Sequence, residues 1–479
     1  MSQATALAVI RLSGPQAAHY LQQLTNNKPL PKPRVATLRR LTDPFSGQPV
    51  DHALVLYFPA PNSFTGEDVV ELHCHGSRAV VTAVTDALLS FENSRLAEPG
   101  EFTQRAWWAG KFDALQVEAL ADLLTADTST QRLQALQQLD GKLSQIYADW
   151  RSTLIAGLAH AEAVIDFGDD EHLDDDDAAD SSAHAQWNIW GGVIDSMTVL
   201  RNNMQKQLQD ARRGELIREG IQIAIVGPPN AGKSSLFNLL AERDAAIVSP
   251  TAGTTRDILE VSLNLGGVKC IVQDTAGVRR STDDDIEREG MKRAQAAAAK
   301  ADLVVAMVDG TERDVGLQIL KNVMDQAKEE LTSAQILLVL NKSDLMDASA
   351  TSDNELPGIS VGQIGGVYRI SCVTQQGIDV FLDSLSDAVV SRVSGNMSLS
   401  DESVATEGAL ITRARHRQHV QTSVEALDRF IELSQQGSMT VDLAAEELRL
   451  AASELGRITG AVDVEDVLDK LFADFCIGK

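Results

Sequence analysis

Cysteine is scarce in this chain, and its few occurrences are far apart. Four cysteines occur among 479 residues: Cys74, Cys270, Cys372 and Cys476. Domains that depend on disulfides for stability are short and dense in cysteine. The scarcity therefore argues against a disulfide framework and indicates a reducing compartment.

Long apolar runs and a leader segment are also missing. No apolar run approaches the roughly 18 residues that span a membrane, so we expect no membrane span. The chain runs almost at once into a strand pattern at Ala6–Leu12, and neither a signal peptide nor a full transit peptide is visible before it. We therefore expect no targeting segment within these residues.

Positive charge is in deficit. The chain has 42 lysines and arginines against 68 acidic residues, a net charge of −26. This balance argues against a protein that coats nucleic acid by bulk charge, although it allows a local basic patch. Nine acidic residues lie between Asp166 and Asp180, and no lysine or arginine occurs from Ser152 to Leu200. We interpret this run as a solvated loop between helices rather than a metal site.

Sequence periodicity divides the chain into four parts, and its length is typical of two to four domains. Residues 1–110 are expected to form a small α/β domain. Residues 220–390 alternate strands and helices, and their nearly all-apolar strands suit a parallel sheet covered on both faces. Residues 111–219 and 391–479 have a helical period. Helical flanks on both sides suggest one helical domain interrupted by the second α/β domain.

Several elements can be placed within these parts. Short β-rich or amphipathic runs bounded by turn residues carry the prediction. Strands are expected at Ala6–Arg11, Ala53–Phe58, Val69–His73, Cys270–Gln273, Leu303–Val308 and Ile336–Leu340, and helices at Ala17–Leu24 and Ala79–Leu89. Met346–Val367 is rich in residues that break regular structure and predicts a loop. Ser391–Thr406 is polar and serine-rich, which is typical of a linker.

His73-Cys74-His75 invites a metal interpretation. Consecutive strand residues point to opposite faces, however, and no fourth ligand lies nearby in the sequence. We therefore predict that Cys74 packs in a core between two polar neighbours.

The stretch Ile221–Ser235, IQIAIVGPPNAGKSS, predicts a phosphate site. A strand pattern leads into a glycine turn and then a helix, and Gly227, Gly232, Lys233 and Ser234 fit the G-x-x-x-x-G-K-[ST] pattern. Glycines let backbone N–H groups surround a phosphate, and the helix N-terminus adds its positive end. Lysine reaches the outer phosphates, and the serine hydroxyl binds Mg²⁺.

Three further motifs follow in order. Gly253–Asp257 offers a threonine for Mg²⁺ and the γ-phosphate, and Asp274–Gly277 offers a carboxylate near the metal and a backbone amide for the phosphate. Asn341–Asp344 follows a strand, and its Asp344 can accept two hydrogen bonds from guanine that adenine does not offer. Ser371–Cys372 can brace the base. Together these motifs predict a guanine-nucleotide site.

One position departs from the common pattern. Ras-like GTPases place a water-orienting glutamine directly after the second of these motifs, where this chain has Val278. A residue from elsewhere must orient water. Asp283–Glu289 offers several carboxylates, and composition does not choose among them.

The whole set of motifs resembles the MnmE (TrmE) family of tRNA modification GTPases. The resemblance covers nearly the whole chain. Besides the nucleotide motifs it includes Asn62–Asp68, Pro99–Phe102, Ala445–Arg449 and the tail Phe475–Lys479. The sequences of Leu410–His416 and Ser371–Cys372 resemble those of the mitochondrial members, which favours the mitochondrial matrix. A bacterial chain would be cytoplasmic.

The resemblance implies an architecture and a reaction. The architecture is an N-terminal α/β folate-binding and dimerisation domain, a discontinuous helical domain and an inserted Ras-like P-loop G domain. The reaction uses a carbon of 5,10-methylenetetrahydrofolate (or a 5-formyl analogue at the same site) to install an aminomethyl-type group, taurinomethyl or carboxymethylaminomethyl, on C5 of the tRNA wobble uridine. The partners implied are tRNA, an FAD-dependent MnmG-type subunit and a second copy of the chain, whose G domains pair when GTP is bound.

The resemblance also assigns residues. Arg11, Glu71, Lys111 and Lys479 match folate-contacting positions, and Glu287 matches the catalytic glutamate, with Glu289 as an alternative because the match needs one extra residue. Mg²⁺ is assigned to Ser234 and Thr255, and K⁺, which would stabilise charge developing on the phosphates, to Asn230, Ser249, Thr251 and Thr254. The remaining nucleotide contacts expected from the motifs and the resemblance are Ala231, Gly232, Lys233, Ser235, Asp274, Thr275, Ala276, Gly277, Asn341, Lys342, Asp344, Ser371 and Cys372.

Some assignments stay open. Cys476 matches a tail cysteine required for modification, or is a small core residue beside Phe475. Two basic segments either touch tRNA phosphates or simply solvate helices: Arg413, Arg415, His416, Arg417 and His419, and Arg212, Arg213 and Arg218. The family usually has about a dozen more residues before the position of Arg11, which leaves the folate pocket and dimer edge in question. The rival interpretation is a ribosome-assembly GTPase, which needs neither the folate-type residues nor this tail.

Overall fold

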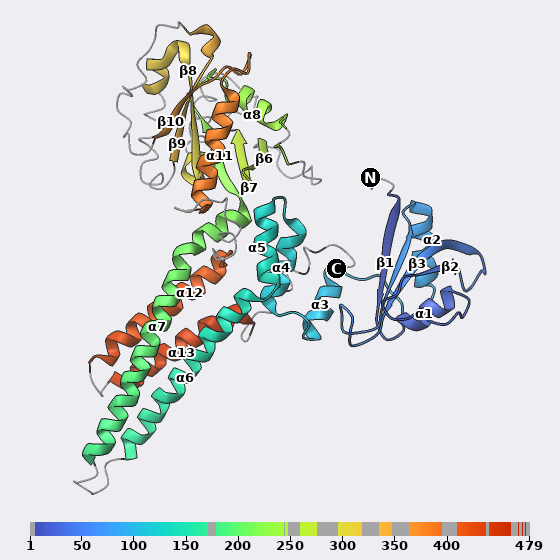
Figure 1. The fold of residues 1–479 in the computed structure, drawn as a ribbon, viewed down its shortest axis with the longest axis horizontal. Coiled ribbons are helices and arrows are strands. Elements are labelled where there is room, and N and C mark those ends of the chain that lie inside the picture. The colour runs from blue at the N-terminus through green and yellow to red at the C-terminus, as the bar shows by residue number, and fades with distance from the viewer. Residues whose placement is uncertain are drawn as a thin grey trace. The chain divides into compact units, whose positions relative to one another are not determined.

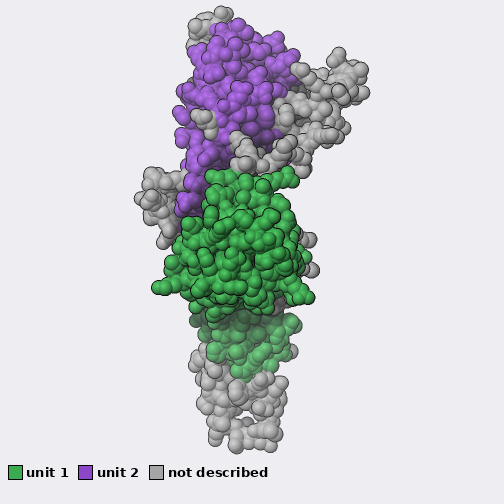
Figure 2. Space-filling model, turned by 90° about the vertical axis from the view of Figure 1, so that its right-hand side faces the viewer, with its two compact units in different colours: residues 1–121, 138–197, 429–479 green, residues 122–137, 198–428 purple. Residues whose placement is uncertain are grey.

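The computed structural model describes most of the chain in separate ranges. These are residues 5–170, 179–243, 245–247, 259–274, 296–318, 335–346, 364–394, 410–436 and 440–460, with Leu468, Phe472 and Phe475; for 166–170, 179–189, 259, 274 and 364 only the backbone is described. The chain divides into two compact units (Figure 2). Unit 1 comprises residues 1–121, 138–197 and 429–479, and unit 2 comprises residues 122–137 and 198–428.

Unit 1 contains an antiparallel four-stranded sheet of order β1-β4-β3-β2 (Figure 1). Its strands are β1 (Leu7–Ser13), β2 (Thr37–Thr42), β3 (Pro49–Phe58) and β4 (Val69–His75). Helices α1 (Ala17–Leu24) and α2 (Arg78–Leu89) share one core with these strands. The predicted strands and helices of this region are confirmed, and β2 is an addition that the sequence pattern did not reveal.

Alternation along β4 separates the two faces of this sheet. Leu72 and Cys74 are fully buried in the core, whereas Glu71 and His73 lie on the other face. Cys74 therefore packs as predicted, and burial raises the pKa of its thiol to about 11. Among the described residues no three histidine, cysteine or acidic side chains gather as a metal site.

Helices from both sides of the nucleotide-binding part meet in unit 1. Helix α6 (Lys142–Asp170) packs along α13 (Val441–Thr459). Trp190 of α7 (Ala179–Glu219) packs against Phe430 of α12 (Ala414–Ser434), with ring centroids 5.7 Å apart. The middle of the acidic run lies between α6 and α7, outside the described residues.

The C-terminal segment contributes to the same unit. Leu468, Phe472 and Phe475 share a core with Ala114 and Val117 of α4 (Ala114–Thr125). The turn before α3 (Glu101–Trp108) approaches this segment closely, since a Cβ on Gly100 would lie 2.5 Å from the carbonyl oxygen of Phe472. Glycine is required there also because its φ is +71°.

Unit 2 contains a six-stranded sheet of order β10-β9-β8-β5-β7-β6, in which only β6 is antiparallel to its neighbour. Its strands are β5 (Ile221–Val226), β6 (Leu259–Leu265), β7 (Val268–Asp274), β8 (Leu303–Asp309), β9 (Gln335–Asn341) and β10 (Ile364–Arg369). Apolar cores cover both faces, with α8 (Lys233–Ala241) and α11 (Ile378–Ser394) in the larger one. The predicted parallel sheet is confirmed.

Two boundary predictions in unit 2 are wrong. The predicted loop Met346–Val367 overlaps β10, which begins at Ile364 and pairs in parallel with β9. The strand was missed because Gly365 and Gly366 weaken its pattern, and the register shifts at that point. The predicted linker from Ser391 begins too early, because α11 continues to Ser394.

The other described helices complete the two units. Helix α5 (Ser129–Leu139) follows α4, and two short 3₁₀ helices, η1 (Gly310–Glu312) and η2 (Ser343–Leu345), follow β8 and β9. None of the helices in the described part of the chain is both long and apolar enough to cross a membrane.

Candidate functional site

The turn between β5 and α8 has the geometry of a phosphate loop. Asn230 and Gly232 both have left-handed backbones, with φ of 60° and 102°. A Cβ on Gly232 would lie 2.1 Å from Nδ2 of Asn341, so only glycine fits. Because this turn ends at the first residue of α8, Lys233, the N-terminus of that helix faces the loop.

Lys233 lies over its own loop. Its Nζ donates hydrogen bonds to the carbonyl oxygens of Gly227, at 2.9 Å, and Pro228, at 2.8 Å. Both acceptors are neutral. A phosphate on the loop would offer the ammonium a charged acceptor, and charge-assisted hydrogen bonds are roughly twice as strong.

Asn341 joins the phosphate loop to the base-recognition loops. Its side chain is buried; Nδ2 donates to the Ala231 carbonyl at 2.9 Å, and Oδ1 accepts from the Cys372 amide at 3.1 Å. The amide of Ser343 in turn donates to Ile370, at 3.0 Å. The asparagine of this motif is therefore a brace between three loops.

Lys342 is fixed by a residue that sequence reasoning missed. Its Nζ lies 2.5 Å from the carboxylate of Asp309, at the end of β8. Burial acts to raise the pKa of Asp309, but hydrogen bonds from Lys342 and Thr311 outweigh it and lower the pKa. The sequence did offer a signal for this ion pair. Asp309 ends the apolar strand β8, which lies beside β9, the strand that leads into the recognition motif.

These loops enclose one cavity of about 640 Å³. Asp344 is exposed in its wall, where its carboxylate can meet a base. Ser371 is fully buried, and burial raises the pKa of the Cys372 thiol to about 11, so that thiol stays neutral at physiological pH. Of the predicted nucleotide residues, the lining includes Asn230, Gly232, Lys233, Ser234, Ser235, Asn341, Lys342, Asp344, Ser371 and Cys372.

The remaining predicted residues are only partly visible. The backbone of Asp274 pairs with Ile225, so the end of β7 lies beside the strand that enters the phosphate loop. Ala231 is buried behind that loop. Residues outside the described part of the chain are Ser249, Thr251, Thr254, Thr255, Thr275, Ala276, Gly277, Glu287, Glu289, Cys476 and Lys479.

A second group of predicted residues lies on the open face of the sheet in unit 1. Nε of Arg11 lies 2.9 Å from Oε1 of Glu71, its neighbour across β1 and β4. Nζ of Lys111 donates to the carbonyl oxygen of Pro61 at 2.7 Å. The structure thus brings Arg11 and Glu71 together, and no described contact joins Lys111 to them.

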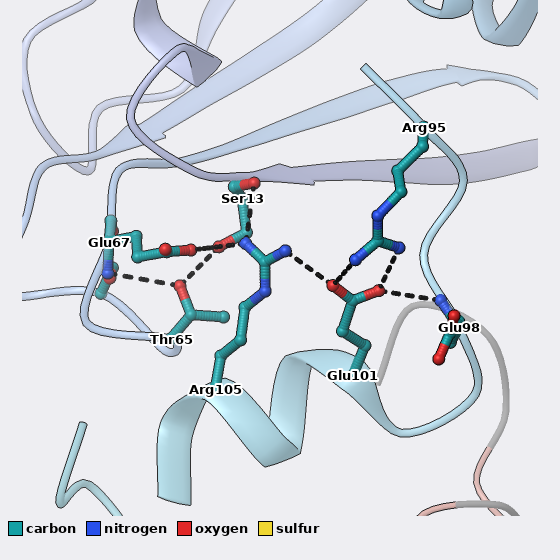
Figure 3. Close-up of polar contacts among 8 residues, drawn as sticks. Ser13, Thr65, Glu67, Arg95, Glu98, Glu101 and Arg105 are labelled. Carbon is teal, nitrogen blue, oxygen red and sulfur yellow. Dashed lines mark hydrogen bonds and ion pairs between the residues drawn. The ribbon is translucent and has the colours of Figure 1, made fainter. Parts of the chain in front are cut away.

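A network of polar side chains joins Ser13, at the end of β1, to Arg105 (Figure 3). Arg105 of α3 bridges two carboxylates, Glu67 at 2.7 Å and Glu101 at 2.6 Å. Glu101 also accepts from Arg95, at 2.6 and 2.9 Å. Burial acts to raise the pKa of Glu101, but hydrogen bonds from Arg95, Glu98 and Arg105 outweigh it and lower the pKa to about 2.

Glu101→Gln is expected to remove a pH-dependent part of the stability of unit 1. Because the folded pKa lies below the ordinary 4.5, the ionised group stabilises the fold above pH 4.5, and this contribution of roughly 3 kcal/mol is lost as the pH falls towards 2. All five tryptophans lie in unit 1, so their fluorescence in urea titrations reports its unfolding. Glu162→Gln, which alters a half-exposed pair with Arg449, is the control and should leave this pH dependence intact. An unchanged profile for Glu101→Gln would contradict the assignment.

The predicted basic segments are engaged inside unit 2. Arg413 and Arg218 both contact Asp122 at 3.0 Å, and Arg417 contacts the buried Glu215 at 2.7 Å. Arg212 and Arg213 contact Asp302 and Asp210, each at 3.0 Å. These ion pairs neutralise much of the segments' charge within the fold.

The strand order, phosphate loop and recognition loops of unit 2 define a P-loop guanine-nucleotide-binding protein. Comparison with known families agrees. The family model described as the MnmE helical domain matches residues 115–476, and that described as the GTP-binding protein TrmE N-terminus matches residues 1–111. The chain belongs to the MnmE family of tRNA modification GTPases.

Individual relatives extend this similarity along the whole chain. The mitochondrial 5-taurinomethyluridine-tRNA synthase subunit GTPB3 of Danio rerio is 42% identical, over 99% of this chain and 90% of that protein. The tRNA modification GTPase MnmE of Parvibaculum lavamentivorans is 45% identical, over 99% and 97%, and that of Paramagnetospirillum magneticum is 46% identical, over 99% and 96%. A solved GTP-binding protein of Sulfolobus solfataricus with GDP covers 54% of this chain and 72% of its own at 16% identity, but its TM-score of 0.28 is too low to support an argument.

Proposed function

We propose that this GTPase acts in the modification of C5 of the tRNA wobble uridine. The cavity that joins the phosphate loop to Asp344 carries the nucleotide part of this proposal, because it holds phosphate-binding and guanine-reading groups together. Family membership supports the tRNA part. The relatives are named for taurinomethyluridine synthesis in mitochondria and for tRNA modification in bacteria, so the compartment proposed is the mitochondrial matrix, or the cytoplasm for a bacterial chain.

We propose that the nucleotide site holds Mg²⁺ and K⁺. Ser234 lies in the cavity wall at the start of α8, and its hydroxyl would bind Mg²⁺ together with Thr255. Asn230 lies in the same wall, and we propose that it holds K⁺ with oxygens from Ser249, Thr251 and Thr254. The cations supply positive charge at the phosphates. Lys233 binds the outer phosphates, Asp344 selects guanine, and Glu287 orients the attacking water, with Glu289 as the alternative.

The open sheet face of unit 1 suits a folate. Arg11, whose side chain is 37% exposed, can bind a carboxylate, and Glu71, whose side chain is 17% exposed, can accept hydrogen bonds from a pterin. Lys111 and Lys479 add cations. We further propose that Cys476 is needed for modification, that an FAD-dependent MnmG-type subunit and tRNA complete the complex, and that two copies associate through their N-terminal domains and pair their G domains when GTP is bound.

Glu287→Ala is expected to lower GTP turnover at least about 100-fold while GTP affinity stays within about twofold, because a water-orienting group acts mainly in the transition state. Single-turnover hydrolysis and equilibrium nucleotide binding measure the two effects. Wild-type turnover should also be several-fold faster in K⁺ than in Na⁺. Retained turnover in Glu287→Ala would move the role to Glu289, and equal rates in the two salts would remove the K⁺ site.

The tRNA part is tested in cells. Nucleoside mass spectrometry of tRNA from cells that lack the gene should show loss of the modified wobble uridine, restored by the wild-type chain but not by Glu287→Ala. Unchanged wobble uridine would contradict the proposal and favour the ribosome-assembly alternative.

A further inference from the structure

The loop 61–68 is attached to β1 through side chains. Oγ of Ser13 lies 2.6 Å from Oγ1 of Thr65 and donates to Glu67 at 2.9 Å. Ser13 follows Arg11 by two residues on β1, so both side chains lie on the same face of the sheet. The loop therefore contacts β1 two residues away from Arg11, which forms the ion pair with Glu71.

The same loop is attached on its other side to the segment that carries Lys111. Pro61 accepts the hydrogen bond of Lys111, and Phe64 packs edge-on against Phe112, with ring centroids 5.6 Å apart. A Cβ on Gly66 would lie 2.7 Å from Cβ of Ala109. Loop 61–68 thus contacts both β1 and the segment that carries Lys111.

Arg105, on helix α3, holds this loop through its ion pair with Glu67. Its guanidinium contacts Glu67 of the loop, Glu101 of its own helix and, at 3.4 Å, the carbonyl oxygen of Ser13 (Figure 3). Arg95 holds Glu101 from the other side. A planar guanidinium with partners on three segments fixes their distances and angles, which a single flexible ammonium does not.

We propose that Arg105 is a positioning residue for the folate-type site: acting through Glu67 and loop 61–68, it sets Lys111 at the distance from Arg11 and Glu71 that one ligand requires. This inference rests on the proposed folate function. In this proposal Arg105 does not touch the folate, and it affects folate binding through Glu67, loop 61–68 and Lys111.

The test measures binding of 5-formyltetrahydrofolate to the full-length chain by calorimetry. Arg105→Gln should weaken binding roughly 10- to 100-fold, the range that the loss of supporting partners causes at metal sites, and Arg105→Lys should recover part of the loss. GTP affinity should not change, because the nucleotide cavity is formed by other residues. Arg457→Gln is the matched control: it removes a 2.7 Å pair with the buried Glu454, away from loop 61–68, and should leave folate binding unchanged.

A double-mutant cycle separates positioning from general stability. If Arg105 acts through Lys111, Arg105→Gln should have little further effect, less than about threefold, in a Lys111→Ala background. Full additivity of the two losses, or unchanged binding by Arg105→Gln, overturns the inference. Tryptophan fluorescence verifies that each variant is folded, and Glu67→Gln replaces Arg105→Gln in the cycle if the latter is not. Absence of binding by the wild type instead overturns the folate function itself.

Discussion

Asp344→Asn is expected to lower the affinity for GTP at least about 100-fold. Asp344 lies in the cavity wall, on η2, which follows the left-handed Lys342 and is tied to Ile370 by a backbone hydrogen bond. Its carboxylate can accept from both guanine N1–H and the exocyclic amine. Asparagine keeps one acceptor but turns a donor towards the amine. Hydrogen bonds to charged groups contribute about 1.5–3 kcal/mol, and each 1.4 kcal/mol is roughly a factor of ten.

The same change should create a new preference. Xanthine has a carbonyl where guanine has the amine, so the asparagine amide can donate to it, and XTP should bind the variant more tightly than GTP. Titration with fluorescent GTP and XTP measures both affinities. Asp379→Asn, at an 80% exposed position at the start of α11 outside the cavity lining, is the control and should bind GTP normally. A variant that keeps wild-type GTP affinity would show that Asp344 does not read the base.

Gly232→Ala is expected to abolish measurable GTP binding. The new Cβ would lie 2.1 Å from Nδ2 of Asn341, so that amide must move and give up its bonds to Ala231 and Cys372. Unpaired buried polar groups cost about 1–3 kcal/mol each, and a left-handed alanine costs about 1–2 kcal/mol more. Both costs fall on the loops that enclose the cavity.

Gly191→Ala provides the matched control for this substitution. Gly191 lies inside α7, and a Cβ there meets nothing within 4 Å. The change should therefore stabilise unit 1 by about 0.5–1 kcal/mol and leave GTP binding unaltered. Binding of GTP by Gly232→Ala at near wild-type affinity would mean that the Asn341 brace is dispensable.

The sequence predicted best where one local pattern decides the structure. The apolar strands β8 and β9 are buried on both faces of their sheet, and their runs of six and five apolar residues are sufficient to identify such strands. The phosphate loop was predictable because its glycine spacing is dictated by backbone geometry. Strand β10 was not, because pairing with β9 compensates for two glycines that locally disfavour a strand.

Contacts between distant residues set the limit of prediction. The motif predicted that Asn341 lies at the nucleotide, but not that it braces Ala231, which lies 110 residues earlier. Arg105 contacts Glu67 and Ser13, which lie 38 and 92 residues earlier in the chain, and no local sequence pattern predicts such pairs. The sequence left tRNA contact and helix solvation open for Arg413 and Arg417, because their partners Asp122 and Glu215 are far away in the chain.

The arrangement of the chain in the two units has a consequence for its synthesis. All residues of unit 2 lie between residues 122 and 428, whereas unit 1 needs residues 429–479 as well as its first 121. On the ribosome, every residue of the nucleotide-binding unit has therefore been made before the C-terminal part of unit 1 appears. Until then, the face of α4 that receives Phe472 and Phe475 lacks its cover. The segment that is translated after all of unit 2 closes a core that α4 began before it.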